Sequence, residues 1–423
     1  MALQAAAVTD DPASAAFPTG TPLAPDLLAE LPHEAAFAVW QVLRCVELWT
    51  AEPEAARRDV FDREYMERWE HGLLTGPLEP EARFPLAVVV RELAAAAPGG
   101  GRLPWACVCV ADWALGRGAR RTGLAFAEAA ARTAPQQPRY AWLAGRLLRG
   151  HGNARAGERW LRRAHRLAVA QRDWETQARS LTSLGNLMAE RGRHGDARHY
   201  HARALRIAQR FRLREQEAMA LHDLFTISIE EGRRTEAERY ARSALEAYSP
   251  TDPRIARLAH DVAYWWMSLG YYARALHVLR ALRPYFTRPE EELWVVANSG
   301  RAAAGMGDHA LFNEMLSAAE TLIPRLSTAE SLAAALLELA YGAVALANWS
   351  AARVLAGRAI DAGQARSEAN VTVRAEALIA AVDRHDSAGL EGVVPVREMA
   401  TRSAEQLADD LLISLERGRG GSA

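Results

Sequence analysis

Small and apolar residues recur along the middle of this chain with a period of about 40 residues. Five glycines follow one another at intervals of 40, 40, 38 and 37 residues, namely Gly152, Gly192, Gly232, Gly270 and Gly307. A compact residue on an apolar helical face lies seven positions before each of them, at Gly145, Gly185, Phe225, Ala263 and Gly300. Another lies five positions after, at Gly157, Ala197, Ala237, Ala275 and Phe312. This pattern predicts a solenoid of helix-turn-helix units that bury their apolar faces against their neighbours.

The spacing has a physical cause. Two antiparallel helices approach closely only where the facing side chains are small, so we expect Gly185 to meet Ala197 and Ala204 to close the contact with the next unit. We expect the turn glycine, Gly192 in this unit, to end the first helix in a left-handed conformation, which glycine adopts without a Cβ penalty.

This unit resembles the tetratricopeptide repeat (TPR) in a longer form of about 40 residues. The resemblance rests on Leu184 to Met188, Gly192-Arg193, Asp196-Ala197 and Ala204-Leu205. The register extends to further units marked by Ala340, Ala347, Ala352 and Ala359, and by Ala111, Gly118, Gly123 and Ala130. It implies an all-α, right-handed TPR-like solenoid of about seven units over residues 104–383.

Both ends of the chain lie outside the repeat register. Residues 1–30 have little periodicity and predict a disordered leader. Residues 31–100 predict an N-terminal bundle of three helices, which is either a cap on the first repeat or a docking element. A final helix over 395–417, which carries Leu407, Leu411 and Leu415, is either a C-terminal cap or an exposed helix that binds a partner.

Composition narrows the functional classes. The 423 residues have a formal net charge of -1, which makes nucleic acid an unfavoured partner. No stretch is apolar enough to span a bilayer, and no secretory signal precedes the first helix, so we expect a cytoplasmic protein. The chain has no lysine, which excludes Schiff-base chemistry and a phosphate-loop lysine. Three cysteines, Cys45, Cys107 and Cys109, indicate neither disulfides nor zinc.

Candidate binding residues follow from the TPR resemblance, which implies that the first helix of each unit lines the concave surface. In each unit, the residue directly after the compact core position then faces the groove, and so does the residue one helical turn before it. This implies ligand contacts for Arg146, Asn186, His260, Tyr264, Arg301 and Tyr341. By the same resemblance, Asn186 uses both its donor and its acceptor on the backbone of an extended peptide.

Two His-Asp pairs occupy the same register in adjacent units, His222-Asp223 and His260-Asp261. They predict either a polar pocket for a ligand, with histidines that change charge near neutral pH, or structural hydrogen bonds between repeats. A metal site is the least favoured alternative, because neighbouring inner helices lie about 10 Å apart.

One early repeat is rich in arginine, with a single acidic residue, Glu158, among Arg139, Arg146, Arg149, Arg155, Arg159, Arg162, Arg163 and Arg166. This excess suits an acidic protein segment, a terminal carboxylate or phosphates. A solvated basic face is the alternative that requires no ligand.

No catalytic motif is present: we find no nucleophile elbow, no HExxH sequence and no glycine-rich phosphate loop. We therefore expect a non-enzymatic scaffold, without cofactor or metal, that binds a peptide or protein segment in the concave groove. One alternative is a peptide-responsive regulator whose N-terminal helices bind a second protein, an architecture that resembles the Rap-type regulators of bacteria. The lesser alternative is a His-Asp metalloenzyme.

Overall fold

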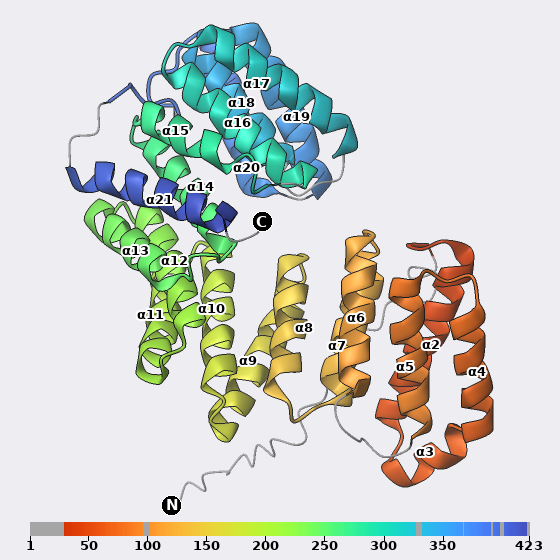
Figure 1. Cartoon of the computed structure of the whole chain (residues 1–423). Helices are drawn as coiled ribbons and strands as arrows, with labels where there is room; N and C mark the ends of the chain where they lie inside the picture. The colour runs from red at the N-terminus through yellow and green to blue at the C-terminus, as the bar shows by residue number, and fades with distance from the viewer. Residues whose placement is uncertain are drawn as a thin grey trace, which may run out of the picture. The chain divides into compact units, whose positions relative to one another are not determined.

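The computed structural model describes residues 29–95, 102–286, 288–326, 332–366, 368–390, 392–397 and 402–420, and these residues form helices without any strand (Figure 1). The predicted leader lies almost entirely outside the described residues. The chain divides into two compact units, Met1–Gln216 and Glu217–Ala423.

The first unit contains four N-terminal helices followed by helices that pair antiparallel in sequence order. They are α2 (His33–Ala51), α3 (Glu54–Val60), α4 (Arg63–Thr75), α5 (Pro80–Ala94), α6 (Arg102–Gly116), α7 (Arg120–Thr133), α8 (Pro138–Gly150), α9 (Ala154–Gln171), α10 (Trp174–Glu190) and α11 (His194–Phe211). The next helix, α12 (Arg214–Glu230), begins in this unit and continues into the second.

The second unit continues the same alternation. Its helices are α13 (Arg234–Ala247), α14 (Arg254–Ser268), α15 (Tyr272–Leu282), α16 (Pro289–Gly305), α17 (His309–Leu322), the short 3-10 helix η1 (Ile323–Arg325), α18 (Leu332–Ala345), α19 (Trp349–Arg366), α20 (Ala369–Arg384) and α21 (Arg402–Gly420).

The turns within the helix pairs have the predicted conformation. Each glycine of the periodic series has a positive φ, for example 71° at Gly192, and Ala347 takes the same role in its unit with φ 54°. The two-residue connections from α9 to α10 and from α11 to α12 begin instead with arginine, since Arg172 and Arg212 cap α9 and α11 in the left-handed conformation. Asp173 then begins the next helix by accepting a hydrogen bond from the Thr176 amide at 3.0 Å.

Close helix packing explains the compact residues before each turn. A Cβ atom on Gly185 would lie 2.5 Å from the His201 ring, so the glycine lets α11 approach α10. The contact therefore falls on His201, one turn beyond the expected Ala197. Ala197 and Ala204 are both fully buried in the same interface.

The N-terminal helices differ from prediction in number. Val60 ends a separate short helix, α3, because the chain turns at Phe61 and Asp62 then caps α4 by accepting a hydrogen bond from the Tyr65 amide at 2.8 Å. One continuous hydrophobic core runs from Leu31 through α5 and α6 to Ala164. The N-terminal helices thus share their core with the first repeats, as a cap would.

The C-terminal segment also differs from prediction. The last helix, α21, begins at Arg402 rather than near Pro395, and residues 392–397 are not helical. None of the described helices combines the length and apolar character that a membrane span requires.

Candidate functional site

The His-Asp pairs of the second unit form a hydrogen-bonded chain between adjacent repeats. His222, on α12, is buried and joins the Tyr248 hydroxyl through Nδ1 at 3.1 Å and the Asp261 carboxylate through Nε2 at 3.0 Å. His260 joins the other oxygen of Asp261 through Nδ1 at 3.2 Å. A single carboxylate on α14 therefore accepts from both histidines.

The network is closed at its far end by Asn298 on α16, whose amide nitrogen lies 2.8 Å from His260 Nε2. Burial raises the pKa of the Asp261 carboxyl, but the hydrogen bonds from His222 and His260 outweigh that effect and hold this pKa well below its usual range. Asp261 is consequently a stable anion at the centre of a network that joins α12, α14 and α16, with both ring nitrogens of each histidine already engaged.

A second polar cluster lies farther along the same unit. Arg301, on α16, forms an ion pair with Glu338 on α18, and both residues are buried. The Tyr264 hydroxyl donates to Glu338 at 3.4 Å, while the Arg301 guanidinium lies 5.7 Å from the centre of the Tyr264 ring and 5.4 Å from that of Tyr341. The charge of Glu338, together with burial, raises the pKa of Tyr264.

A non-helical segment of the chain contacts this cluster at Gly392; we call it the strap and define it as residues 392–397. Arg301 Nη2 donates to the Gly392 carbonyl at 2.8 Å, and the Tyr272 hydroxyl donates to the Val394 carbonyl at 2.9 Å. The Arg397 amide donates to the Gly270 carbonyl at 2.9 Å. Two side chains and the Gly270 carbonyl thus hold the strap through its backbone, a mode of binding that is largely independent of its sequence.

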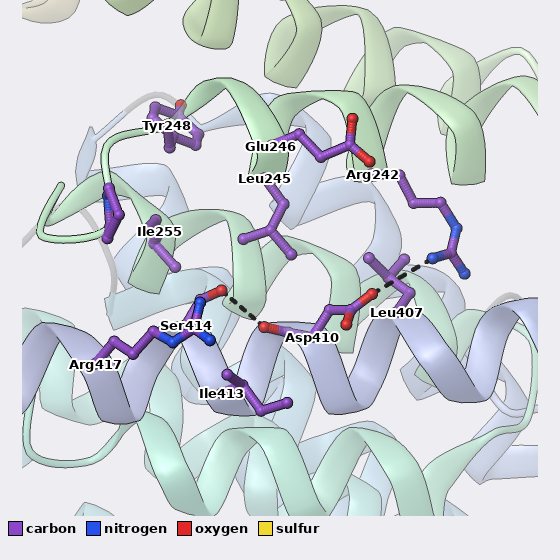
Figure 2. A pocket seen from close by; sticks show the side chains of 11 residues that line it. Arg242, Leu245, Glu246, Tyr248, Ile255, Leu407, Asp410, Ile413, Ser414 and Arg417 are labelled. Atoms are coloured by element: carbon purple, nitrogen blue, oxygen red, sulfur yellow. Dashed lines mark hydrogen bonds and ion pairs between the residues drawn. The ribbon is translucent and has the colours of Figure 1, made fainter.

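The helix α21 follows the strap and packs against α13, α14 and α15 (Figure 1). Leu407, Leu411 and Leu415, spaced four residues apart, are buried against these helices. Figure 2 shows the cavity of about 420 Å³ that remains beside α21, where Arg242 approaches Asp410 at 3.6 Å. The predicted C-terminal helix thus docks as an amphipathic helix onto a helical surface.

The corresponding face of the first unit carries open polar groups. The Trp142 ring on α8 lies between two arginines, with Arg146 at 5.4 Å and Arg179 at 5.1 Å from the ring centre, and its indole donates to Ser183 at 3.1 Å. Asn186 on α10 is half-buried and makes no hydrogen bond to any described residue. Arg146 is exposed and makes neither a hydrogen bond nor an ion pair with the described residues.

The structure therefore distributes the predicted site residues over three places. His222, His260 and Asp261 meet in the first network, and Asp223 on α12 contributes a charge that, after burial, raises the pKa of Tyr248. Tyr264, Arg301 and Tyr341 meet in the second cluster, and Arg146 and Asn186 lie in the other unit.

Three partners of these clusters are not among the residues that we predicted from the sequence. Asn298 and Glu338 lie two positions before Gly300 and Ala340, the register that Asp223 and Asp261 have in their units, so the repeat pattern could have identified both. Gly392 lies outside the repeats, and only the fold brings it to Arg301. The described residues contain no group of three or more His, Cys, Asp or Glu side chains arranged to hold a metal ion.

Comparison with known proteins yields a match in structure alone. No protein-family model and no curated protein matches the chain. Among solved structures, it is similar to a Rap protein complexed with competence and sporulation factor, with a TM-score of 0.51 and 12% identity over 79% of this chain and 99% of the other. It is also similar to the Rap conjugation gene regulator of the plasmid pLS20 in complex with the Phr* peptide, with a TM-score of 0.51 and 12% identity over 78% and 96% of the two chains. The fold is thus a helical repeat of the TPR and Rap type, which confirms the all-α repeat architecture.

Proposed function

We propose that the protein is a non-enzymatic interaction scaffold that binds an extended segment of a peptide or protein along the first helices of its repeats. The observation that carries the proposal is the strap, because Arg301 holds the backbone carbonyl of Gly392 at 2.8 Å. An extended polypeptide is therefore a natural occupant of this surface.

The repeat register extends this argument to the first unit. Arg301 follows the compact core residue Gly300, and Arg146 and Asn186 follow Gly145 and Gly185 in the same register. Arg301 has a backbone to hold, whereas Arg146 and Asn186 have no hydrogen-bonding partner among the described residues. We infer that these two side chains, with the Trp142 ring between its arginines, hold a segment of another molecule.

The test begins with selection of binders from a phage-displayed library of random 12-residue peptides on the intact protein. A selected peptide is labelled with fluorescein, and its affinity for single variants R146A and N186A is measured by fluorescence anisotropy. Loss of one buried hydrogen bond to a ligand costs about 1–3 kcal/mol, so each variant should bind about 5- to 150-fold more weakly.

The matched control is R159A, which removes an exposed, unpaired arginine from the second helix of the same repeat pair. It should bind the selected peptide as the parent protein does, and circular dichroism should show equal helicity for all variants. Full binding by an R146A/N186A double variant, or equal loss in R159A, would place the site elsewhere.

A peptide-responsive regulator is the second candidate function, favoured by the structural match to Rap proteins determined with a peptide or signalling factor bound. Small-angle scattering with and without a selected peptide separates the two. A regulator of this kind should change its radius of gyration on binding, and a static adaptor should keep it. In neither case do we propose a catalytic step, because the sequence carries no catalytic motif.

A further inference from the structure

The second helix of one repeat, α11, carries an unneutralised arginine stripe. Arg203, Arg206 and Arg210 follow at intervals of three and four residues and therefore share one face. None of the three forms an ion pair with a described residue, and Arg206 and Arg210 are exposed. Asp196 is the only acidic residue in this helix, so the positive charge of the stripe is left uncompensated.

The preceding second helix, α9, repeats this charge pattern. It carries five arginines and one acidic residue, Glu158, and Arg166 occupies the same register as Arg206. Burial, followed by the charges of Arg203 and Arg166, lowers the pKa of His165 on α9. The arginines of α9 and α11 therefore contribute positive charge to the same region of the surface.

An aromatic hollow adjoins the stripe on α11. The rings of Trp174 and Phe211 stack with their centres 4.3 Å apart and their planes at 6°, and together with Ile207 they provide the apolar lining. The hollow has a volume of about 690 Å³ and includes all three arginines of the stripe. The oxygen Oε1 of Gln177, another lining residue, is buried and accepts no hydrogen bond from a described residue.

We propose that this surface docks an acidic segment of another protein that carries an apolar or aromatic anchor side chain. The anchor enters the hollow beside Trp174 and Phe211, carboxylates pair with Arg203, Arg206 and Arg210, and a backbone amide donates to Gln177 Oε1. The stripe from Arg203 to Arg210 is about 10 Å long at 1.5 Å per residue, which matches about three residues of extended chain. The site includes Trp174 and Gln177 at the start of the first helix α10, but it uses none of the residues Trp142, Arg146, Arg179 and Asn186 of the surface proposed above.

The lining favours a protein segment over nucleic acid. Ile207 and the stacked Trp174–Phe211 pair require an apolar side chain, and a sugar-phosphate backbone offers none. The two rings also already stack on each other, which leaves less aromatic surface for a base. In addition, the whole chain has a net charge of -1, which gives no overall attraction to nucleic acid.

The experiment uses the intact protein and three fluorescein-labelled probes. The first is a decapeptide with a central Trp-Leu pair flanked on each side by two Glu-Asp repeats, and the second has Ser-Ser at its centre. The third is a 20-nucleotide single-stranded DNA. By anisotropy, the first peptide should bind more weakly as salt rises from about 50 to 200 mM, since the contacts are largely ionic. The Ser-Ser peptide should bind at least fivefold more weakly.

The variant R206E/R210E should lose at least tenfold in affinity for the first peptide. Its matched control is R257E/R280E, which makes the same charge change at two exposed arginines in the other unit and should bind normally. Circular dichroism checks that both variants remain helical. The proposal is overturned if neither peptide binds, if both peptides bind equally, if both double variants lose equal affinity, or if the DNA binds more tightly than the first peptide.

Discussion

The buried Arg301–Glu338 pair provides the sharpest test of how the second unit is stabilised. The change E338Q keeps the shape of the side chain and removes its charge. Arg301 is 3% exposed and Glu338 is 7% exposed, so water cannot replace the lost partner. The guanidinium would retain the Gly392 carbonyl and the faces of Tyr264 and Tyr341, none of which carries a full negative charge.

The expected cost follows from this geometry. Removal of one member of a buried ion pair costs about 3–5 kcal/mol, because an uncompensated charge remains in a low-dielectric interior. The amide oxygen of E338Q can still accept a hydrogen bond from Arg301, so we expect a value near 3 kcal/mol. The double variant R301M/E338M also removes the buried Arg301 charge, and only the half-buried Arg374, whose guanidinium lies 3.9 Å from Glu338, then loses an ion-pair partner, so most of the loss should be recovered.

Urea unfolding followed by circular dichroism measures the free energy of unfolding. Hydrogen exchange in α16 and α18 shows whether the helices that carry Arg301 and Glu338 unfold in the transition that the variant shifts. The unfolding midpoint should fall for E338Q and return toward the parent value for R301M/E338M. A loss below about 1 kcal/mol for E338Q, or a double variant no more stable than E338Q, would refute the account of a buried, mutually dependent pair.

Three further outcomes are expected. In D261N the free energy of unfolding should fall less steeply with decreasing pH, below about pH 4, than it does in the parent protein. The reason is that the pKa of Asp261 is lower in the folded than in the unfolded state. The stability that its ionised carboxylate contributes is therefore complete above the unfolded pKa and is lost as the pH falls toward the native pKa. In G270A the new Cβ would lie 2.2 Å from the Pro395 carbonyl oxygen at a φ of 86°, so hydrogen exchange of the strap should accelerate; unchanged exchange would contradict the contact. In R212G the strain of a non-glycine residue in the left-handed cap of α11 is removed, so thermal unfolding should show a gain in stability of roughly 0.5–1 kcal/mol. A lower melting temperature would show that the Arg212 side chain stabilises the protein by more than its left-handed backbone destabilises it.

The repeat architecture was open to prediction because it depends on local periodicity. Compact residues before each turn and glycines with a positive φ recur at fixed spacing, and both follow from how two neighbouring helices must pack. The same register identified Arg146, Asn186, Arg301 and the two His-Asp pairs as candidates. The N-terminal helices were harder to divide, since the turn at Phe61 carries no glycine or proline signal.

What the amino-acid sequence determines by itself, then, is a line of paired helices and the positions on them that repeat. Only the tertiary structure decides which of these positions remain open, because the strap returns to Gly270, Tyr272 and Arg301 and α21 packs on α13, α14 and α15. Contacts between residues so far apart in sequence leave no periodic trace. They depend on where a non-repetitive tail comes to lie, and its backbone hydrogen bonds place few demands on its side chains.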